Sequence, residues 1–340
     1  MAAKAWGIQQ AANGAHGASG AQGSKATAVK PVEEVFFQNE AVSLCLLVNR
    51  RARTMRVVDF RAGPSHAKRL FVLSLAQREG VEKAYTLVER DECATWVKLG
   101  FAKEGNIPGF YKRSDAFLLG CVVPPPGRAK VLERAAVDDD DAPSQSGTRI
   151  AAASPSGSAP MTPAQELMER TILTAKKALK DGPEKAPPAA KIASISEAEA
   201  RKAVAAALKT GRALTAFEAF GRDAERKYFV GTARGGFELV ASTESQACFG
   251  NAYLELLQSP RTDAEKAGTN GVLRAFCDRL TAEGVVSCFS LAPSDDLALA
   301  TAYLQNGFRR TGLLLDHLVV GDRRKDAIIW ARKLANPSDE

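Results

Sequence analysis

The chain has 340 residues, of which 45% are hydrophobic and 25% are charged, and its formal net charge is +7. This size allows about two ordinary domains, and no apolar run reaches the roughly 20 residues that cross a bilayer, so we expect no membrane segment. Basic residues are scattered among acids, six cysteines stand singly and only three histidines occur, which favours neither a nucleic-acid partner nor a metal site.

Changes in composition divide the chain. Residues 1–31 are rich in Gly, Ala, Ser and Gln and lack the apolar core of a signal peptide, which predicts a disordered tail and a cytoplasmic protein. Residues 125–165 are rich in Pro, Ser, Gly and Ala and cannot bury enough apolar area to offset the entropy of ordering them, so we expect a disordered linker. A linker helix is predicted over 166–189, which leaves ordered domains at 32–124 and 190–335.

The first ordered block alternates β-branched and aromatic residues with turn formers and helical stretches. The helix that opens at Pro64 and Ser65 closes on Gly80, which is a favourable stop signal. The predicted order is β, β, β, α, β, α, β, over residues 32–49 (two strands), 54–63, 64–80, 81–90, 91–101 and 114–123.

The second block repeats this order and adds a strand and an Ala-rich helix at its front. Its central helix places Val272, Leu273, Phe276, Cys277 and Leu280 on one face, which is typical of a helix packed on a sheet. The predicted elements are 191–196, 197–211, 226–231, 237–242, 247–257, 269–284, 285–293, 297–308, a strand around His317, and 326–334.

The two blocks also keep register with each other. Residues 61–80 and 265–284 are each 20 residues long and end in Gly, and each is followed by a Val-led strand and a short helix that ends in Gly-Phe. In both blocks another Gly comes four residues after that Phe, and an Asp-Ala step opens the last strand. This ordered series predicts an internal repeat.

The arrangement resembles the GCN5-related N-acetyltransferase (GNAT) superfamily, and the run A-x-x-Y-x-x-x-G-F at residues 300–308 carries the resemblance most directly. The resemblance covers most of the second block, and the first block from the family's second strand onward. It implies a mixed, mostly antiparallel α/β sheet flanked by helices in each domain, with acetyl-CoA as co-substrate. In that family a loop offers backbone N–H groups to the pyrophosphate, beside the positive end of a helix.

In the second block the family's loop corresponds to residues 265–270. Gly268 matches, whereas Glu265 stands where Gln or Arg is usual and Asn270 stands where a second small residue is usual. The resemblance implies that Tyr303 protonates the departing thiolate and that Glu255 takes a proton from the amine. The implied cofactor-binding residues here are Gly268, Thr269, Asn270 and Gly271.

The first block departs further from the pattern. Arg61 matches the start of the loop, and Arg61 and Ser65 are its implied cofactor contacts. Pro64 has no N–H to donate, and Trp96 replaces the tyrosine and offers no acid near the pKa of a thiol. We therefore expect a degenerate, structural first domain and a catalytic second domain.

Alternatives remain open at several of these positions. Tyr303 could be a packing residue and Glu255 a surface acid, while Tyr111 could line a pocket or join the two blocks. The favoured function is acetyl transfer from acetyl-CoA to a primary amine of a small molecule or a protein, with no metal. The alternative is an inactive tandem scaffold or acyl-CoA sensor that binds a protein partner, because both loops depart from the family's pattern.

Overall fold

The computed structural model describes residues 32–38, 43–50, 52–59, 66–111, 114–124, 161–181, 187–214, 225–233, 237–246, 250–321 and 323–335. The predicted N-terminal tail and residues 125–160 of the predicted linker lie outside this part of the chain. We call residues 32–124 the N-terminal half and residues 161–335 the C-terminal half. The division into two domains stays a prediction.

The N-terminal half follows the predicted order with one addition, the strand β5. Its polar sequence, AKEGNI, lacks the β-branched alternation that identifies the other strands. The elements are β1 (Val32–Gln38), β2 (Ser43–Asn49), β3 (Thr54–Asp59), α1 (His66–Arg78), β4 (Lys83–Val88), α2 (Cys93–Lys98), β5 (Ala102–Ile107) and β6 (Ala116–Val122).

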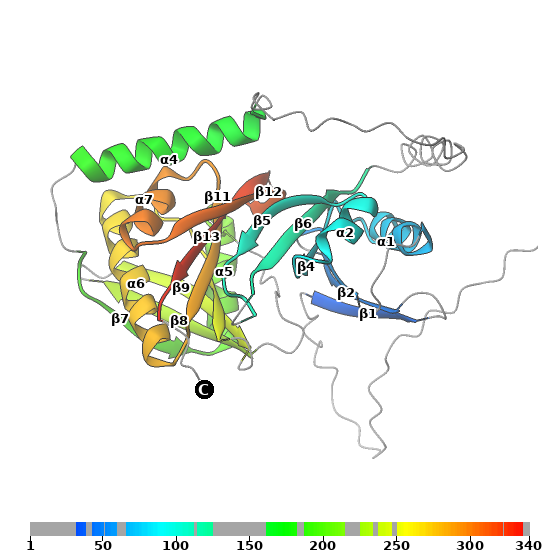
Figure 1. The fold of residues 1–340 in the computed structure, drawn as a ribbon. Helices are drawn as coiled ribbons and strands as arrows, with labels where there is room; N and C mark the ends of the chain where they lie inside the picture. Colours follow the sequence, from blue (N-terminus) through cyan, green and yellow to red (C-terminus); the bar gives the residue numbers. More distant parts are fainter. Residues whose placement is uncertain are drawn as a thin grey trace, which may run out of the picture.

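The C-terminal half begins with the helix α4, which starts three residues earlier than the predicted linker helix and lies across α7 (Figure 1). Its Met168, Ile172 and Ala175 are buried in the core of this half, so α4 is part of the packed structure. The elements are α4 (Pro163–Asp181), β7 (Ala190–Ile195), α5 (Glu197–Lys209), β8 (Glu225–Ala233), β9 (Phe237–Gln246), β10 (Asn251–Leu256), α6 (Asp263–Ala282), β11 (Ser287–Pro293), α7 (Leu297–Gln305), β12 (Arg309–Val320) and β13 (Arg323–Lys333).

One sheet runs through both halves in the order β1-β2-β3-β4-β6-β5-β12-β13-β11-β10-β9-β8-β7. Read outward from the centre, β5-β6-β4-β3-β2-β1 has the same pattern as β12-β13-β11-β10-β9-β8. The pairs β3/β4 and β10/β11 are parallel, and the other paired strands are antiparallel. The predicted fold class, a mixed and mostly antiparallel α/β sheet with helices, is confirmed.

The two halves meet at β5 and β12. Gly105 pairs with Gly312, the only ladder pair between the halves in the described residues. These are the two glycines at matching positions of the sequence repeat. A Cβ built on Gly312 would lie 2.5 Å from Gly105 Cα, so both positions need glycine for the backbones to approach.

In the N-terminal half the described helices pack on one face of the sheet, whereas in the C-terminal half helices lie on both faces. In the C-terminal half α4, α6 and α7 pack on Leu239, Ala241 and Leu254, while α5 contacts Val240 and therefore lies on the opposite face. In the N-terminal half the cluster of buried residues that includes Trp96 joins α1 and α2 to the sheet. Figure 1 shows these two helical layers at opposite ends of the molecule.

A separate buried cluster joins the halves. It combines Tyr85 and Phe110 with Tyr253, Phe289 and Ile329, among others. Tyr111 packs against this cluster, with its ring edge-on to Phe110 of the same half, and its role at a pocket or between the halves stays a prediction.

Polar groups reinforce the junction. Lys83 and Glu104 form a buried ion pair at 2.5 Å, and His317 is fully buried with its ring edge against Tyr85. Arg324 of β13 donates to Glu82 and to backbone carbonyls of the N-terminal half.

The sequence predicts neither a membrane-spanning segment nor a metal site. No helix within the described ranges is long and apolar enough to cross a membrane, and the cytoplasmic location stays a prediction. Within the same ranges no group of three or more His, Cys, Asp or Glu residues is arranged to hold a metal ion.

Candidate functional site

The start of α6 differs from the sequence-based expectation. Thr262 is its N-cap, and a capping box forms with Glu265, so residues 265–270 are helical and the predicted loop is wrong. The Glu265 carboxylate accepts from the backbone N–H groups of Arg261 and Thr262 and pairs with Arg212 at 3.1 Å. A helix N-terminus attracts anions, and here the chain's own carboxylate occupies that position.

The glycines within α6 have a packing explanation. A Cβ on Gly268 would clash with the ring of Phe237, and one on Gly271 would clash with the carbonyl oxygen of Pro188. Both glycines, together with Thr269 and Asn270, are buried in the helix. The small residues that resembled a phosphate loop therefore let α6 approach β9 and the segment before β7.

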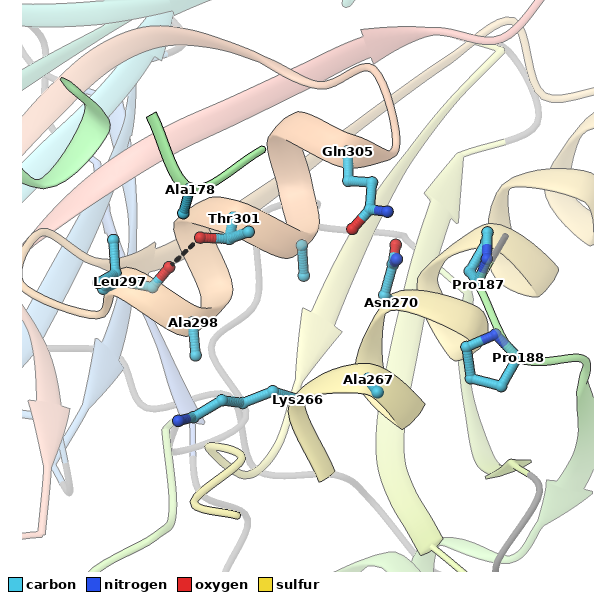
Figure 2. Close-up of a pocket in the computed structure, with 11 residues that line it drawn as sticks. Ala178, Pro187, Pro188, Lys266, Ala267, Asn270, Leu297, Ala298, Thr301 and Gln305 are labelled. Carbon is cyan, nitrogen blue, oxygen red and sulfur yellow. Dashed lines mark hydrogen bonds between the residues drawn. The ribbon is translucent and has the colours of Figure 1, made fainter. Parts of the chain in front are cut away.

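A groove lies between α6 and α7, and Figure 2 shows its walls. Lys266, Ala267 and Asn270 of α6 face Thr301 and Gln305 of α7 across a pocket of about 480 Å³. The walls are completed by Ala178 of α4, by Pro187 and Pro188 before β7, and by Leu297, Ala298 and Ala302 of α7. The Lys266 ammonium is partly exposed and pairs with Asp263 at 2.9 Å, so the groove combines apolar walls with one cation.

Asn306 ties the two helices of the groove together. Its buried side chain donates to the carbonyl oxygen of Asn270, to the Asn270 side chain at 2.6 Å, and to the carbonyl of Ala302. Neither Asn306 nor Lys266 was identified from the sequence. The position of Asn306 directly before Gly307, at the end of α7, was the signal that could have marked it.

Beside the groove, β10 and β11 diverge. Their parallel ladder joins Asn251 to Ser287, Ala252 to Cys288 and Tyr253 to Phe289, and no further pair follows although both strands continue. The divergence opens toward the start of α7, which follows β11. Such a gap between strands is where a ligand can meet backbone groups that no neighbouring strand pairs.

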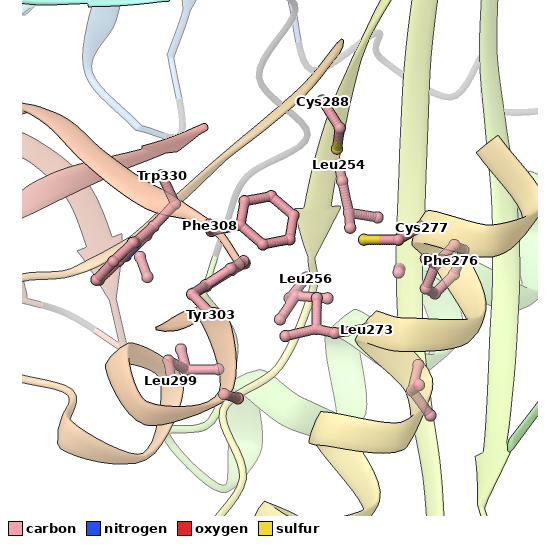
Figure 3. Packing of buried hydrophobic residues seen from close by; sticks show 14 of the residues in the cluster. Leu254, Leu256, Leu273, Phe276, Cys277, Cys288, Leu299, Tyr303, Phe308 and Trp330 are labelled. Carbon is pink, nitrogen blue, oxygen red and sulfur yellow. The ribbon is translucent and has the colours of Figure 1, made fainter. Parts of the chain in front are cut away.

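Tyr303 lies beside this divergence with its side chain fully buried. Its hydroxyl lies 2.6 Å from the Ser290 hydroxyl, and its ring stacks on Trp330 with centroids 5.5 Å apart. Figure 3 shows Tyr303 among Trp330, Phe308 and Leu256, in the apolar interior. Burial raises the pKa of Tyr303 well above its ordinary value, and the Ser290 hydrogen bond only partly opposes this.

Glu255 is part of a buried cluster on the other face of the same strands. Arg226 donates to Glu255 and Glu244, at 2.7 Å in each case, and Ser242 donates to Glu255 at 2.8 Å. The open alternative of a surface acid is thus wrong. Burial acts to lower the pKa of Arg226, but the two carboxylates outweigh this effect and raise the pKa above its usual range.

The predicted site residues therefore occupy three places. Asn270 lines the groove, Tyr303 is buried beside it, and Glu255 lies in the ionic cluster on the opposite face. Arg61 and Ser65 lie outside the described residues. The cluster's central cation, Arg226, was missed because one arginine on an alternating strand carries no motif.

No model of a known protein family matches the chain, and no curated protein matches it. Solved structures match part of the chain. The ribosomal-protein-S18-alanine N-acetyltransferase of Escherichia coli is 19% identical, with a TM-score of 0.34, over 44% of this chain and 97% of that one. The spermidine N-acetyltransferase of Vibrio cholerae, solved with CoA and spermine, is 11% identical, with a TM-score of 0.35, over 43% of this chain and 96% of that one.

Proposed function

We propose that the protein is an N-acetyltransferase whose C-terminal half moves an acetyl group from acetyl-CoA to a primary amine, with a structural N-terminal half. The observation that carries the proposal is the groove between α6 and α7 beside the diverging strands β10 and β11, with the hydrogen-bonded hydroxyls of Tyr303 and Ser290 buried next to it. The acceptor amine belongs to a small molecule or to a protein.

The residues fit acetyl-CoA in part. The amide cradle implied by the sequence does not fit, because residues 265–270 are helical and Glu265 fills the helix end. The groove fits better, since its Ala, Pro and Leu walls suit the methyl and methylene groups of the pantetheine arm and Lys266 can meet a phosphate. We therefore assign phosphate contact to Lys266 instead of the backbone of 265–270.

Tyr303 would supply the proton for the departing thiolate. A raised phenol pKa disfavours proton transfer to a thiolate of ordinary basicity, but burial in the same interior also raises the pKa of thiols. Burial raises the pKa of Cys277 to about 11 and that of Cys288 well above its usual value. Burial of a CoA thiol beside Tyr303 would act on its pKa in the same direction.

Glu255 would take the proton from the acceptor amine. Its carboxylate is held in place by the ion pair with Arg226 and by the hydrogen bond that Ser242 donates. Glu244 holds the second arm of Arg226, so the cluster has two carboxylates and one guanidinium and suits a cationic acceptor.

The second candidate function, a non-catalytic acyl-CoA sensor or scaffold, is favoured by one specific observation. The anion position at the start of α6 is already filled by Glu265, which a bound pyrophosphate would have to tolerate. A protein partner would then bind the chain differently when the groove is occupied and when it is empty.

Acetyl-CoA calorimetry on the full chain, followed by turnover with polyamine and peptide amines, separates these functions. We expect saturable binding that the Lys266→Gln variant weakens about tenfold, because the phosphate contact is lost. Lys202→Gln on α5, which removes an exposed cation far from the groove, is the matched control. Binding without turnover on any amine would favour the sensor, and no heat at millimolar acetyl-CoA would overturn both functions.

A further inference from the structure

A second pocket lies at the junction of the two halves, away from the groove. It has a volume of about 550 Å³ and is bounded by Pro108 and Gly109, which follow β5, and by the first residues of β11 and β12 and the end of β13. The groove lies near the residues that follow β11, whereas this junction pocket lies at the first residue of that strand. The residues that line this pocket have no role in the acetyl transfer proposed above.

Strand register brings two cations to one face of this pocket. Arg309 is directly opposite Ala331, and Lys333, two residues further along β13, is directly opposite Ser287. Arg309 and Lys333 are thus diagonal neighbours, which usually lie about 7–8 Å apart. Neither forms an ion pair within the described residues, and no carboxylate lines the pocket. Both side chains are exposed, so water and salt weaken their mutual repulsion, and an anion between them would be attracted by both.

A third cation reaches the pocket from the other face of β13. Arg332 lines it, with its Nε 3.7 Å from where a Cβ on Gly307 would lie, and its charge acts to lower the pKa of Cys277 against the larger effect of burial. A Cβ at residue 307 would be in ordinary contact with this guanidinium, and glycine is favoured at 307 because its φ is +74°.

Two hydroxyl groups in the lining have no partner. Ser287 is 7% exposed and Thr311 is half-buried, and the hydroxyl oxygens of both make no hydrogen bond within the described part of the chain. Buried polar groups are nearly always paired, and an unpaired one calls for a ligand, an ion or a water molecule. Each hydroxyl depends on a single side-chain torsion, so a change of rotamer can turn it toward the pocket.

We propose that the junction pocket binds a small molecule through a phosphate group. The phosphate lies between Arg309 and Lys333, with Arg332 beside it and the hydroxyls of Ser287 and Thr311 as further donors. The remainder of the ligand lies against Pro108 and Gly109. Because the lining comes from both halves, the ligand stabilises their junction as well as filling the pocket.

Inorganic phosphate, titrated into the full chain at constant ionic strength with chloride as the reference salt, tests the site. We expect saturable heat and a rise in the unfolding midpoint that chloride does not reproduce. The double variant Arg309→Gln/Lys333→Gln should weaken phosphate binding at least tenfold. Arg274→Gln/Lys202→Gln removes the same charge from exposed helix positions and should bind as the unaltered chain does.

Equal phosphate affinity in the two double variants, or no saturable binding, would overturn the proposal. Binding of citrate without binding of phosphate would also overturn it, since the ligand group would then be a carboxylate. Circular dichroism checks that both variants fold. Ser287→Ala, a conservative change, should lower affinity only a few-fold. Acetyl-CoA binding should be the same in all these variants, so failure here is distinguishable from failure of the proposed function.

Discussion

The two parallel strand pairs, β3/β4 and β10/β11, differ in how the gap beyond their last ladder pair is filled. Each ladder stops after three residue pairs. In the N-terminal half the next residue, Thr86, donates its hydroxyl to the Val57 carbonyl across the gap at 2.8 Å. In the C-terminal half the matching residue, Ser290, contacts the Tyr303 hydroxyl instead. The first gap is bridged by a hydroxyl of its own strand, whereas at the second the hydroxyl pairs with Tyr303 and both hydroxyls are buried beside the groove.

The turns that follow show what the two halves share. The Phe101 N–H bonds to the Trp96 carbonyl and the Phe308 N–H to the Tyr303 carbonyl, both at 3.0 Å. The ring pairs Trp96/Phe101 and Tyr303/Phe308 are both edge-on, with centroids 5.0 and 5.1 Å apart. Packing therefore accounts for the repeated turn, and it does not account for the hydroxyl of Tyr303.

The largest expected effect concerns the junction at which the repeated halves meet. Gly312→Val would force a Cβ against the Gly105 backbone, which cannot move aside as a flexible side chain could. We expect a loss of about 3 kcal/mol or more in the free energy of unfolding, and separate transitions for the two halves. Chemical denaturation followed by fluorescence measures both.

Ala102→Val on β5 is the control, because that residue is exposed and a β-branched side chain suits a strand. An unchanged single transition for Gly312→Val would show that the halves do not depend on this close approach.

The second prediction tests the difference in chemistry between the halves. Tyr303→Phe should lower kcat for acetyl transfer about a hundredfold, as expected for loss of a general acid, with acetyl-CoA affinity nearly unchanged. The change also leaves the Ser290 hydroxyl unpaired, so turnover is measured well below the unfolding midpoint. Trp96→Phe, at the matching position, should leave kcat unchanged, and an equal loss in both variants would remove the proposed distinction.

Local patterns predicted most of the fold. Alternating strands, Gly stops and the repeated Gly-Phe steps identified nearly every element, because these signals reflect short-range backbone preferences. The strand β5 was omitted from the predicted order, since its polar residues pair for reasons of tertiary context. The pairing of Gly105 with Gly312 joins positions far apart in sequence, and no local pattern contains it.

The site was harder to predict, because motif spacing does not specify backbone conformation. Gly268 matched a loop pattern, yet Thr262 and Glu265 also form a capping box, and the helix signal prevailed. Similarly, Glu255 lies on an alternating strand that gives no sign of its partner Arg226. Pairing between distant strands decides such contacts.

The third prediction concerns pH and the junction. Burial, with Lys83 and Arg324 nearby, lowers the pKa of His317 from 6.5 to about 3. The unfolded chain then binds a proton that the folded chain excludes, so stability falls as pH drops from about 6.5 toward 3, by up to about 1.4 kcal/mol per pH unit. His317→Phe, which keeps a ring against Tyr85, should lack this component of acid denaturation. Parallel stability curves for both proteins across that range would refute the assignment.

The smallest effect concerns the start of α6, where Glu265 supplies an anion, whereas the first described turn of α1 has no acidic residue. Burial acts to raise the pKa of Glu265, but the amides of Arg261 and Thr262 and the charge of Arg212 outweigh it and lower the pKa. Glu265→Gln keeps a capping side chain and removes the charge, so we expect a stability loss of about 0.5–1 kcal/mol.

The same change removes a carboxylate from the helix end next to Lys266, and acetyl-CoA affinity should therefore rise a few-fold if pyrophosphate lies in the groove. Calorimetry on Glu265→Gln, with Glu283→Gln at the other end of α6 as the matched control, measures this. A lower affinity in Glu265→Gln alone would mean that the carboxylate orders the groove for its ligand. In that case Glu265 would contribute to ligand binding in the C-terminal half, and the two halves would differ in the groove as well as in the hydroxyl of Tyr303.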